Sequence, residues 1–230
     1  MTPPSPHFCA EDALPFIDGE ALVIDKPAGL PVSRPRRGGA SLEDHLGALR
    51  FGFQRAPQPV HRLDQDTSGC LLLARHAKAL KRFGAAFEQG GVEKVYWGII
   101  DAVIEEQAGT IELALAKVSS AAEGWRIVPD ASGKRAVTHW RCLSVAGGLS
   151  LIEFRPETGR THQIRVHALH GLGHALVGDP VYGAVDRAGL MLHAAHLAVP
   201  RAGKPPIVAS APMPARFLQR GFSIPEAVDA

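Results

Sequence analysis

The densest group of side chains that could carry out chemistry lies in one short segment, HRLDQDTSG, at residues 61–69. Its polar members are His61, Arg62, Asp64, Asp66 and Thr67. The apolar run that follows, CLLLAR at 70–75, is typical of a buried strand. Catalytic groups are commonly carried on loops that a rigid sheet positions, so we expect this loop to carry the function.

Part of this segment also fits a calcium loop, because D-x-D-x-S-G from 64 to 69 matches the first half of an EF-hand. An EF-hand loop needs a bidentate glutamate at its twelfth position. Here the twelfth position is Arg75 and the ninth is Leu72. We therefore exclude calcium binding by this loop.

A histidine-based metal site is a second interpretation, since six histidines gather in the last third of the chain. They are His162, His167, His170, His174, His193 and His196. His167, His170 and His174 are spaced so that they would share one helix face. However, the chain has no HExxH order there and no cysteine partner, and the only nearby carboxylates are Glu157 and Asp179. We favour core histidines, hydrogen-bonding histidines or RNA contacts, and we expect no metal.

A third segment, ETGRTHQIR at 157–165, combines a Thr-Gly turn with the start of a helix predicted over 161–172. The free backbone N–H groups of such a start, together with Arg160, suit an anion such as phosphate. Arg165 lies inside the helix in an apolar neighbourhood, where an arginine needs a carboxylate partner. Asp64 is our candidate partner, and an exposed surface ion pair is the alternative.

Charge is unevenly distributed, although the net charge of the chain is only +2. Residues 31–82 hold ten basic and four acidic side chains, and RPRRGG at 34–39 reads as a basic loop with Arg34, Arg36 and Arg37. A localised basic zone is what the neutralisation of RNA phosphates requires. A solvated charged face explains the same residues, so charge alone does not decide between the two.

Composition indicates a globular protein, with 230 residues of which 46% are hydrophobic and 21% charged. No apolar run approaches the roughly 18 residues of a membrane-spanning helix, and the first ten residues do not resemble a signal peptide. The three cysteines, Cys9, Cys70 and Cys142, form no CxxC pair. We therefore expect a reducing, cytoplasmic location.

Strand patterns dominate the chain. Strands are predicted over 21–25, 70–75, 94–103, 110–116, 136–143, 149–154 and 191–199. Helices are predicted over 41–50, opened by a capping box, over 77–89 and over 161–172. Gly147-Gly148 predicts a hairpin. This pattern predicts an α+β fold around a mixed, mainly antiparallel sheet.

Several segments, taken together and in order, resemble the RluA-type pseudouridine synthase family. HRLDQDTSG resembles the catalytic motif of that family, and the histidine at its start favours the RluA branch over the RsuA branch. The other matching segments are LVIDKPAGLPV (22–32), EKVYWGII (93–100), ETGRTHQIRVH (157–167), GDPVYG (178–183) and LMLHAAHL (190–197). The resemblance covers roughly residues 20 to 220, and departures are small: Cys70 where an aliphatic residue is usual and Ala175 where proline often stands.

The resemblance implies a fold, namely two sublobes with flanking helices and a central basic cleft, and a reaction, the conversion of a specific uridine in RNA to pseudouridine without metal or organic cofactor. It assigns the essential carboxylate to Asp64, the tyrosine that stacks on the target base to Tyr96 and the arginine that pairs with the carboxylate to Arg165. Arg62 would enter the RNA stack when the base leaves. Further RNA contacts are expected at His61, Thr67, Arg160, Ile164 and the three arginines of the basic loop.

The resemblance also implies the domain layout. We expect an N-terminal extension at 1–19 without an S4 domain, a catalytic domain at 20–222 and a tail at 223–230. We expect a monomer whose partner is a tRNA stem-loop or a ribosomal RNA loop, with no membrane and no obligatory protein partner. An Asx-turn explains Asp66. The alternatives are a catalytically silent RNA-binding module and a histidine-based metallohydrolase.

Overall fold

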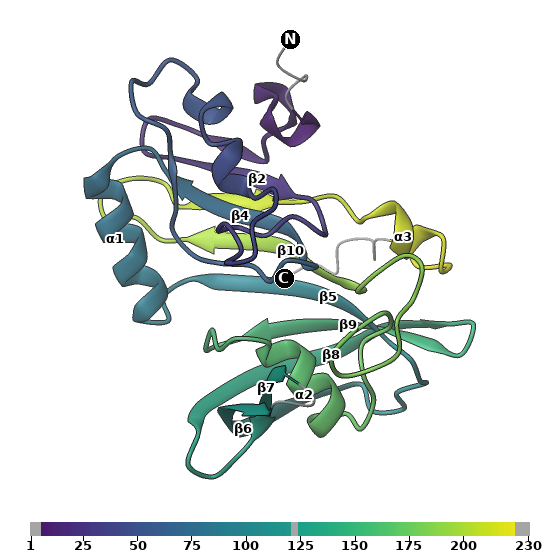
Figure 1. Cartoon of the computed structure of the whole chain (residues 1–230). Coiled ribbons are helices and arrows are strands. Elements are labelled where there is room, and N and C mark those ends of the chain that lie inside the picture. Colours follow the sequence, from purple (N-terminus) through teal and green to yellow (C-terminus); the bar gives the residue numbers. More distant parts are fainter. Residues whose placement is uncertain (1–5, 121–123, 224–230) are drawn as a thin grey trace. The chain divides into compact units, whose positions relative to one another are not determined.

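The computed structural model describes residues 6–120 and 124–223. The chain forms two compact units, each built from two stretches of sequence (Figure 1). The first unit contains residues 1–94 and 194–212, and the second contains residues 95–193 and 213–230. The domain boundaries expected from the sequence stay a prediction, and most of the expected C-terminal tail lies outside the described residues.

The first unit is a sheet with one long helix. Its elements are β1 (Phe16–Ile17), β2 (Ala21–Lys26), β3 (Gln58–Pro59), β4 (Ser68–Ala74), α1 (Ala77–Glu88), most of β10 (Leu192–Val199) and β11 (Ile207–Ser210). The strand order is β1-β2-β4-β10, with β3 beside β4 and β11 beside β10. β2 and β4 pair antiparallel from Ala21↔Ala74 to Lys26↔Gly69. Strand β1 lies within the expected N-terminal extension and extends this sheet.

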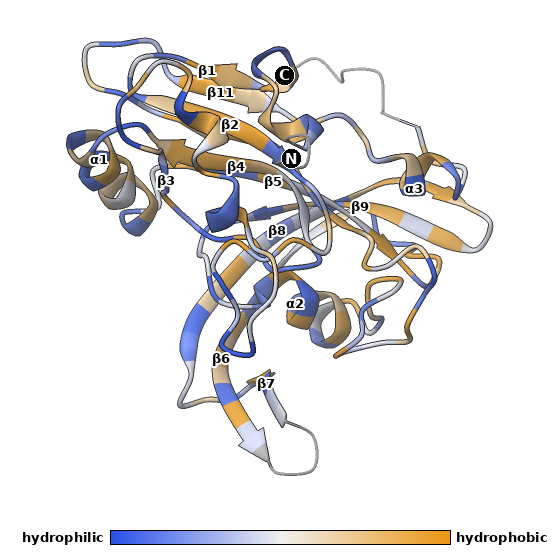
Figure 2. Cartoon of the chain, turned by 45° about the horizontal axis from the view of Figure 1, so that its top comes forward, coloured by the Kyte–Doolittle hydropathy of each residue, from blue (hydrophilic) through white to orange (hydrophobic). Residues whose placement is uncertain are grey.

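Burial explains why these segments form strands. All seven residues of β4 are buried, and the first four residues of β2 are fully buried and hydrophobic, as is β4 from Cys70 onward (Figure 2). The helix α1 places Ala79 and Phe83 against this sheet. At the start of α1, the ring of His76 accepts the backbone N–H of Ala79 at 3.1 Å, which caps the helix.

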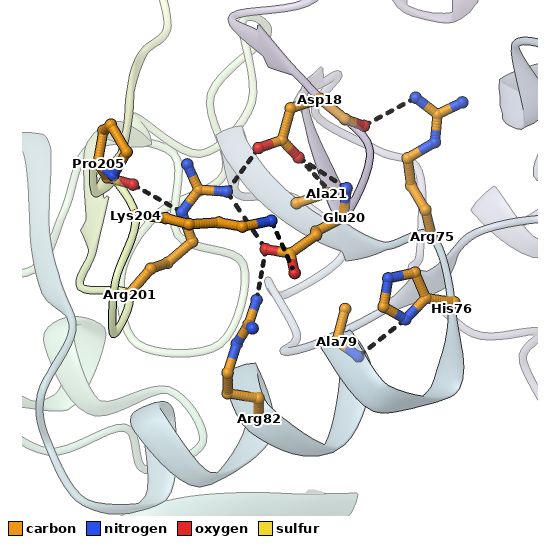
Figure 3. A network of polar contacts seen from close by, with 10 residues as sticks. All are labelled: Asp18, Glu20, Ala21, Arg75, His76, Ala79, Arg82, Arg201, Lys204 and Pro205. Atoms are coloured by element: carbon orange, nitrogen blue, oxygen red, sulfur yellow. Dashed lines mark hydrogen bonds and ion pairs between the residues drawn. The ribbon is translucent and has the colours of Figure 1, made fainter.

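A network of charged side chains ties the ends of several elements of the first unit together (Figure 3). Glu20, in the turn between β1 and β2, accepts hydrogen bonds or ion pairs from Arg82 of α1 at 2.6 Å and Lys204 at 3.3 Å. Arg201 pairs with Asp18 at 2.5 Å and is 5% exposed. The hydrogen bond from Arg82 and the two nearby cations lower the pKa of Glu20 to about 2.

The second unit holds the longer strands. Its elements are most of β5 (Glu93–Ile100), β6 (Ala108–Ser120), β7 (Gly124–Pro129), β8 (Lys134–Ala146), β9 (Leu149–Pro156), α2 (Gln163–Gly171) and α3 (Ala215–Leu218). The strand order is β5-β9-β8-β6-β7, and these neighbours pair antiparallel. Gly147 and Gly148 take positive φ angles of 59° and 80° in the β8–β9 hairpin.

Two hydrophobic clusters place α2 on the sheet of the second unit. Ile164 and Ala168 belong to a cluster with Phe154 of β9 and Trp140 of β8. Val166 packs with strand residues Leu115, Ile127 and Ala136 in another. Such burial of α2 holds its first turn firmly against β6, β7 and β8.

The structure confirms the α+β fold with a mainly antiparallel sheet and few helices. It differs from the prediction in several elements. The segment predicted as a helix over 41–50 consists of two 3₁₀ turns, Leu42–Asp44 and Ala48–Arg50, opened by the expected capping box at Ser41. Strands β1, β3, β7 and β11 and the short helix α3 were not predicted. Among the described residues, no helix is long and apolar enough to span a membrane.

Candidate active site

Hydrogen bonds from Lys26 hold the loop at 61–69 in place, and the side chain of Lys26 is fully buried. Its ammonium donates to the carbonyl oxygens of Pro27, Leu30 and Gln65 at 2.8, 2.8 and 2.9 Å. The backbone N–H of Gly29 donates to the same Gln65 oxygen at 3.0 Å. Because Gln65 follows Asp64 directly, the turn after β2 sets the position of the candidate carboxylate. No role of Lys26 was predicted from the sequence.

At the start of the loop, His61 already has two partners within the protein. Its Nε2 accepts the backbone N–H of Leu72 in β4 at 3.1 Å, and its ring stacks on Phe87 of α1 with centroids 4.4 Å apart. Burial and the nearby charge of Lys94 lower the pKa of His61 to about 3. The imidazole is therefore neutral at pH 7 and anchors the loop, while an RNA contact by His61 stays a prediction.

The end of the loop is equally constrained. The backbone N–H of Thr67 donates to the carbonyl oxygen of Asp64 at 3.2 Å, which closes a tight turn. Thr67 is 2% exposed, and this burial argues against the predicted RNA contact of its side chain. Gly69 has φ +108°, and a Cβ there would lie 2.2 Å from the carbonyl oxygen of Ala194. Only glycine fits that position without a backbone shift.

The two side chains expected to meet RNA differ in exposure: Asp64 is half-buried, whereas Arg62, two residues earlier, is exposed. The turn thus presents both side chains at the surface of its unit, while its backbone is held by hydrogen bonds inside the unit.

Arg75, which stands where a calcium loop would need glutamate, is buried and donates to the carbonyl oxygens of Asp18, Arg50 and Phe51.

In the second unit, Arg165 of α2 is 4% exposed and forms a two-bond ion pair with Asp179. Its Nε donates to Oδ2 and its Nη2 donates to Oδ1, each at 2.7 Å. Oδ1 also accepts the backbone N–H groups of Val181 and Tyr182. Burial alone would raise the pKa of Asp179, but the bonds and charge of Arg165 outweigh it and lower that pKa.

Asp179 is therefore a carboxylate partner of Arg165 that was not predicted. The pairing of Arg165 with Asp64, expected from the sequence, stays a prediction. The segment GDPVYG at 178–183 contained the signal, because an aspartate before a Pro-Val-Tyr turn can accept the N–H groups of that turn.

Tyr96 and Ile164 lie in the same part of the second unit. Tyr96 of β5 is half-buried and packs against the cluster that contains Ile164 and Phe154. Phe154 of β9 is the residue paired with Tyr96 across the two strands. A tyrosine in this position offers a ring edge or face and a hydroxyl beside an apolar wall. These surroundings are compatible with the role that the resemblance assigns to Tyr96.

The segment that leads into α2 is ordered by hydrogen bonds to the side chain of Gln163. The backbone N–H of Arg160 donates to Oε1 of Gln163 at 3.0 Å, and the side chain of Thr158 donates to the same oxygen at 2.7 Å. The guanidinium Nε of Arg160 donates to the carbonyl oxygen of Arg135 at 3.2 Å. The N-cap residue His162 makes no side-chain cap hydrogen bond, and Arg160 is exposed, so the phosphate site expected here stays a prediction.

The basic loop at 34–39 has no regular secondary structure, as expected. Arg34 is exposed, pairs with Asp44 and so joins the loop to the capping box of the 3₁₀ turn. Arg36 and Arg37 are exposed as well. Their RNA contacts stay a prediction.

The histidines do not form a metal centre among the described residues, where no group of three or more His, Cys, Asp or Glu could hold a metal ion. His139, on β8, bonds Thr110 and Glu157 instead. His167 is fully buried, and neither ring nitrogen has a hydrogen-bond partner. Burial lowers the pKa of His167 to about 4, so it is a neutral core histidine.

Comparisons with known proteins agree with the motifs. The family model described as RNA pseudouridylate synthase matches residues 20–170. The chain belongs to the RNA pseudouridylate synthase family. Members of this family are isomerases, and the activity of this chain is accordingly the conversion of uridine in RNA to pseudouridine.

Two relatives of the family come from Zymomonas mobilis. An uncharacterized RNA pseudouridine synthase is 56% identical over 210 residues, which cover 90% of this chain and 96% of the relative. Ribosomal large subunit pseudouridine synthase D is 40% identical over 79% of this chain. The chain spans 62% of that relative and 65% of a relative from Synechocystis, so some family members are considerably longer.

Solved structures share the fold. Human RNA pseudouridylate synthase domain containing 4 superposes with a TM-score of 0.76, covering 91% of each chain at 24% identity. Human RNA pseudouridylate synthase domain containing 1 gives a TM-score of 0.71 at 28% identity, covering 87% of this chain and 82% of the other. The pseudouridine synthase fold is therefore shared well beyond the catalytic motif.

Proposed function

We propose that this pseudouridine synthase uses Asp64 as its essential carboxylate, acting on a uridine in a structured RNA. The observation that carries this proposal is the fixed turn at 64–67, where a fully buried lysine and a backbone hydrogen bond hold the half-buried Asp64. A catalytic carboxylate must be held in one geometry to act on one sugar carbon. A loop that only bound RNA phosphates would not need a carboxylate there.

The reaction breaks the C1′–N1 bond, turns the uracil and joins C5 to C1′. The C5 proton leaves and N1 gains a proton, so the product is an isomer and no oxidant, metal or organic cofactor is needed. Asp64, ionised, either bonds to the sugar or takes a proton from it. Tyr96 provides a flat face for the detached uracil and a hydroxyl that can accept the proton from C5.

Arg62 is assigned to base flipping. A stacked uridine cannot reach a carboxylate, and unstacking it costs about a few kcal/mol. Arg62 is exposed and lies two residues before Asp64, so it can fill the gap that the base leaves and hydrogen-bond there.

The RNA is a tRNA stem-loop or a ribosomal RNA loop. Two relatives named for the large ribosomal subunit support the second, with 40% and 33% identity to this chain. The chain covers only 62% and 60% of those relatives, so the remaining parts of the relatives can contribute to their substrate choice. We expect a cytoplasmic monomer without an obligatory protein partner.

The decisive experiment compares Asp64→Asn with Asp66→Asn, which changes the other carboxylate of the same loop. RNA from cells lacking this protein is incubated with each purified variant, and pseudouridine is mapped. We expect Asp64→Asn to abolish isomerisation while RNA binding stays within threefold, and Asp66→Asn to retain turnover. Turnover by Asp64→Asn would refute the assignment, and RNA binding without turnover by the unmodified protein would favour the catalytically silent module.

A further inference from the structure

The hairpin formed by β6 and β7 carries an exposed indole on the face that packs on α2. At the inner end of that face, Leu115 and Ile127 are buried against Val166. Further out on the same face, by strand alternation, are Lys117 of β6 and Trp125 of β7. Trp125 is 46% exposed, whereas Leu115 and Ile127 at the inner end of the same face are 5% and 7% exposed.

The indole is held on two sides rather than left free to rotate. The ammonium of Lys117 lies 4.9 Å from the centroid of the Trp125 ring, and the ring of His162 lies 5.0 Å from it at an interplanar angle of 33°. Both contacts restrict the rotamer of Trp125. An aromatic ring that is already ordered loses little entropy when it stacks on a ligand.

His162 itself has a strained backbone. It has φ +54° at the N-cap of α2, in the left-handed region that residues other than glycine rarely adopt. Contacts maintain this conformation: Nδ1 of His162 shares a hydrogen bond of 2.9 Å with the hydroxyl of Tyr182. Strain of this kind is typical of functional positions.

The same contacts lead from Trp125 to Arg165. The hydroxyl of Tyr182 accepts the backbone N–H of Ile127 at 3.0 Å, which ties the hairpin to the turn after Asp179. The guanidinium of Arg165 lies 5.1 Å from the centroid of the Tyr182 ring. Trp125 is therefore linked through His162 and Tyr182 to the arginine that the family resemblance assigns to the reaction.

The charge around the indole favours RNA as its ligand. Among the described residues, the strand positions of β6 and β7 on this face hold no carboxylate, while Lys117 supplies a cation. Arg160, also exposed, stands two residues before His162. An exposed aromatic ring with neighbouring cations is the combination by which proteins bind unpaired nucleotides.

We propose that Trp125, with Lys117 and His162, is a stacking platform for one unpaired base of the substrate RNA beside the target uridine. The base stacks on the exposed part of the indole, and Lys117 contacts the adjoining phosphate. This inference deepens the proposed function, because it names unpaired nucleotides flanking the target as part of what the enzyme recognises. It is independent of the role of Asp64.

Binding is tested first with the full chain and two probes, a single-stranded oligouridylate of eight nucleotides and an RNA duplex of equal length. We expect Trp125→Ala to weaken binding of the single strand about tenfold or more, and Trp125→Phe to restore most of the affinity. The matched control is Val118→Ala, which changes an exposed residue on the opposite face of the same hairpin and should bind within twofold of the unmodified protein. Duplex binding should change less than threefold in all variants.

A second measurement uses Lys117→Gln, which keeps the indole. The slope of log affinity against log salt for the single strand should fall by about 0.7, the value for one lost phosphate contact. Circular dichroism of each variant checks folding. Should Trp125→Ala be unfolded, the other two variants still decide the question. Quenching of tryptophan fluorescence by the single strand should be weaker in Trp125→Phe than in the unmodified protein, and the salt dependence of binding should be weaker in Lys117→Gln. Unchanged quenching and unchanged salt dependence would refute the platform.

Turnover separates this inference from the proposed function. With RNA from cells lacking the protein, Trp125→Ala should raise KM about tenfold and leave kcat within threefold. If the unmodified protein forms pseudouridine and Trp125→Ala matches it in both KM and oligouridylate binding, the platform is refuted and the proposed function stands. If the unmodified protein forms no pseudouridine but loses oligouridylate affinity in Trp125→Ala, the platform stands and the proposed function fails. Equal weakening of single strand and duplex would also refute the platform.

Discussion

In the first unit, a buried ammonium holds the loop that carries Asp64, whereas in the second a buried carboxylate holds the arginine of α2. Lys26 donates to three backbone carbonyl oxygens. Asp179, in contrast, accepts two hydrogen bonds from the charged side chain of Arg165 and two from backbone N–H groups. The first arrangement joins a charge to neutral main-chain groups, and the second joins two full charges.

This difference predicts which change each region tolerates. Removal of one partner from a buried ion pair leaves an uncompensated charge and costs about 3–5 kcal/mol. Removal of a donor from neutral carbonyl groups costs less, about 1–3 kcal/mol, because those groups can turn toward water or new donors. We therefore expect changes at α2 to unfold the protein and changes at the loop mainly to misplace Asp64.

The largest effect is expected for Asp179→Asn, which removes the carboxylate that makes two charged hydrogen bonds to the buried guanidinium of Arg165. The free energy of unfolding, measured by urea denaturation, should fall by about 3–5 kcal/mol, and turnover should fall with it. Arg165→Met in addition should recover part of the lost stability, because the buried charge is then gone. A loss below 1 kcal/mol in the single variant would show that the ion pair does not stabilise the second unit.

The next effect concerns acid stability and His167, on the same helix. Its folded pKa of about 4 lies below the value of 6.5 in an unfolded chain, so the folded state favours the neutral ring. As pH falls from 6.5 to 4, the unfolded state gains a proton first, and stability should fall by about 3 kcal/mol. Near pH 7 the ring of His167 is largely neutral in both the folded and the unfolded chain, so His167 makes little contribution to the pH dependence of stability there.

Denaturation curves at pH 7 and pH 4.5 test this expectation. His167→Leu should lose less stability between the two values than the unmodified protein, whereas His170→Leu, at an exposed position of α2, should lose the same amount. Identical pH dependence in the His167 variant and the unmodified protein would place the acid sensitivity elsewhere, for example at His61.

The sequence could predict those features that depend on local pattern. Composition and spacing over a few residues predicted the buried run at 70–75 and the helix at 77–89. They also predicted the candidate catalytic loop between residues 61 and 69. β7 was missed because GWRIVP has no clear alternation, and it becomes a strand only by pairing with β6. The ion pair of Arg165 with Asp179 was not predicted, because it depends on how a turn fourteen residues later folds back, which spacing does not encode.

An intermediate effect is expected for Lys26→Met, which keeps the apolar stem of the side chain and removes the three bonds to carbonyl oxygens. The loop should shift, and kcat should fall about 10- to 100-fold while KM stays within threefold, because displacement of a catalytic group by about 1 Å can cost that much. Lys78→Met, an exposed change on α1, is the control and should leave kcat unchanged. Equal effects on kcat and KM in the Lys26 variant would indicate general unfolding rather than a displaced Asp64.

The smallest effect is expected for Glu20→Gln in the charge network of the first unit. The carboxylate lies near three cations, and its pKa of about 2 is below the ordinary 4.5, so the network stabilises the fold at neutral pH and this contribution is lost as pH falls from 4.5 toward 2. Solvent reaches Lys204 and Arg82, and such pairs contribute about 0–1 kcal/mol each.

Glu20→Gln should lower the melting temperature by a few degrees in dilute buffer, and by less in 1 M NaCl, where charges are screened within about 3 Å. Glu88→Gln, an exposed carboxylate at the other end of α1, should change it in neither buffer. A loss of stability that is equal in both buffers would mean that Glu20 acts through packing of the β1–β2 turn and not through its charge.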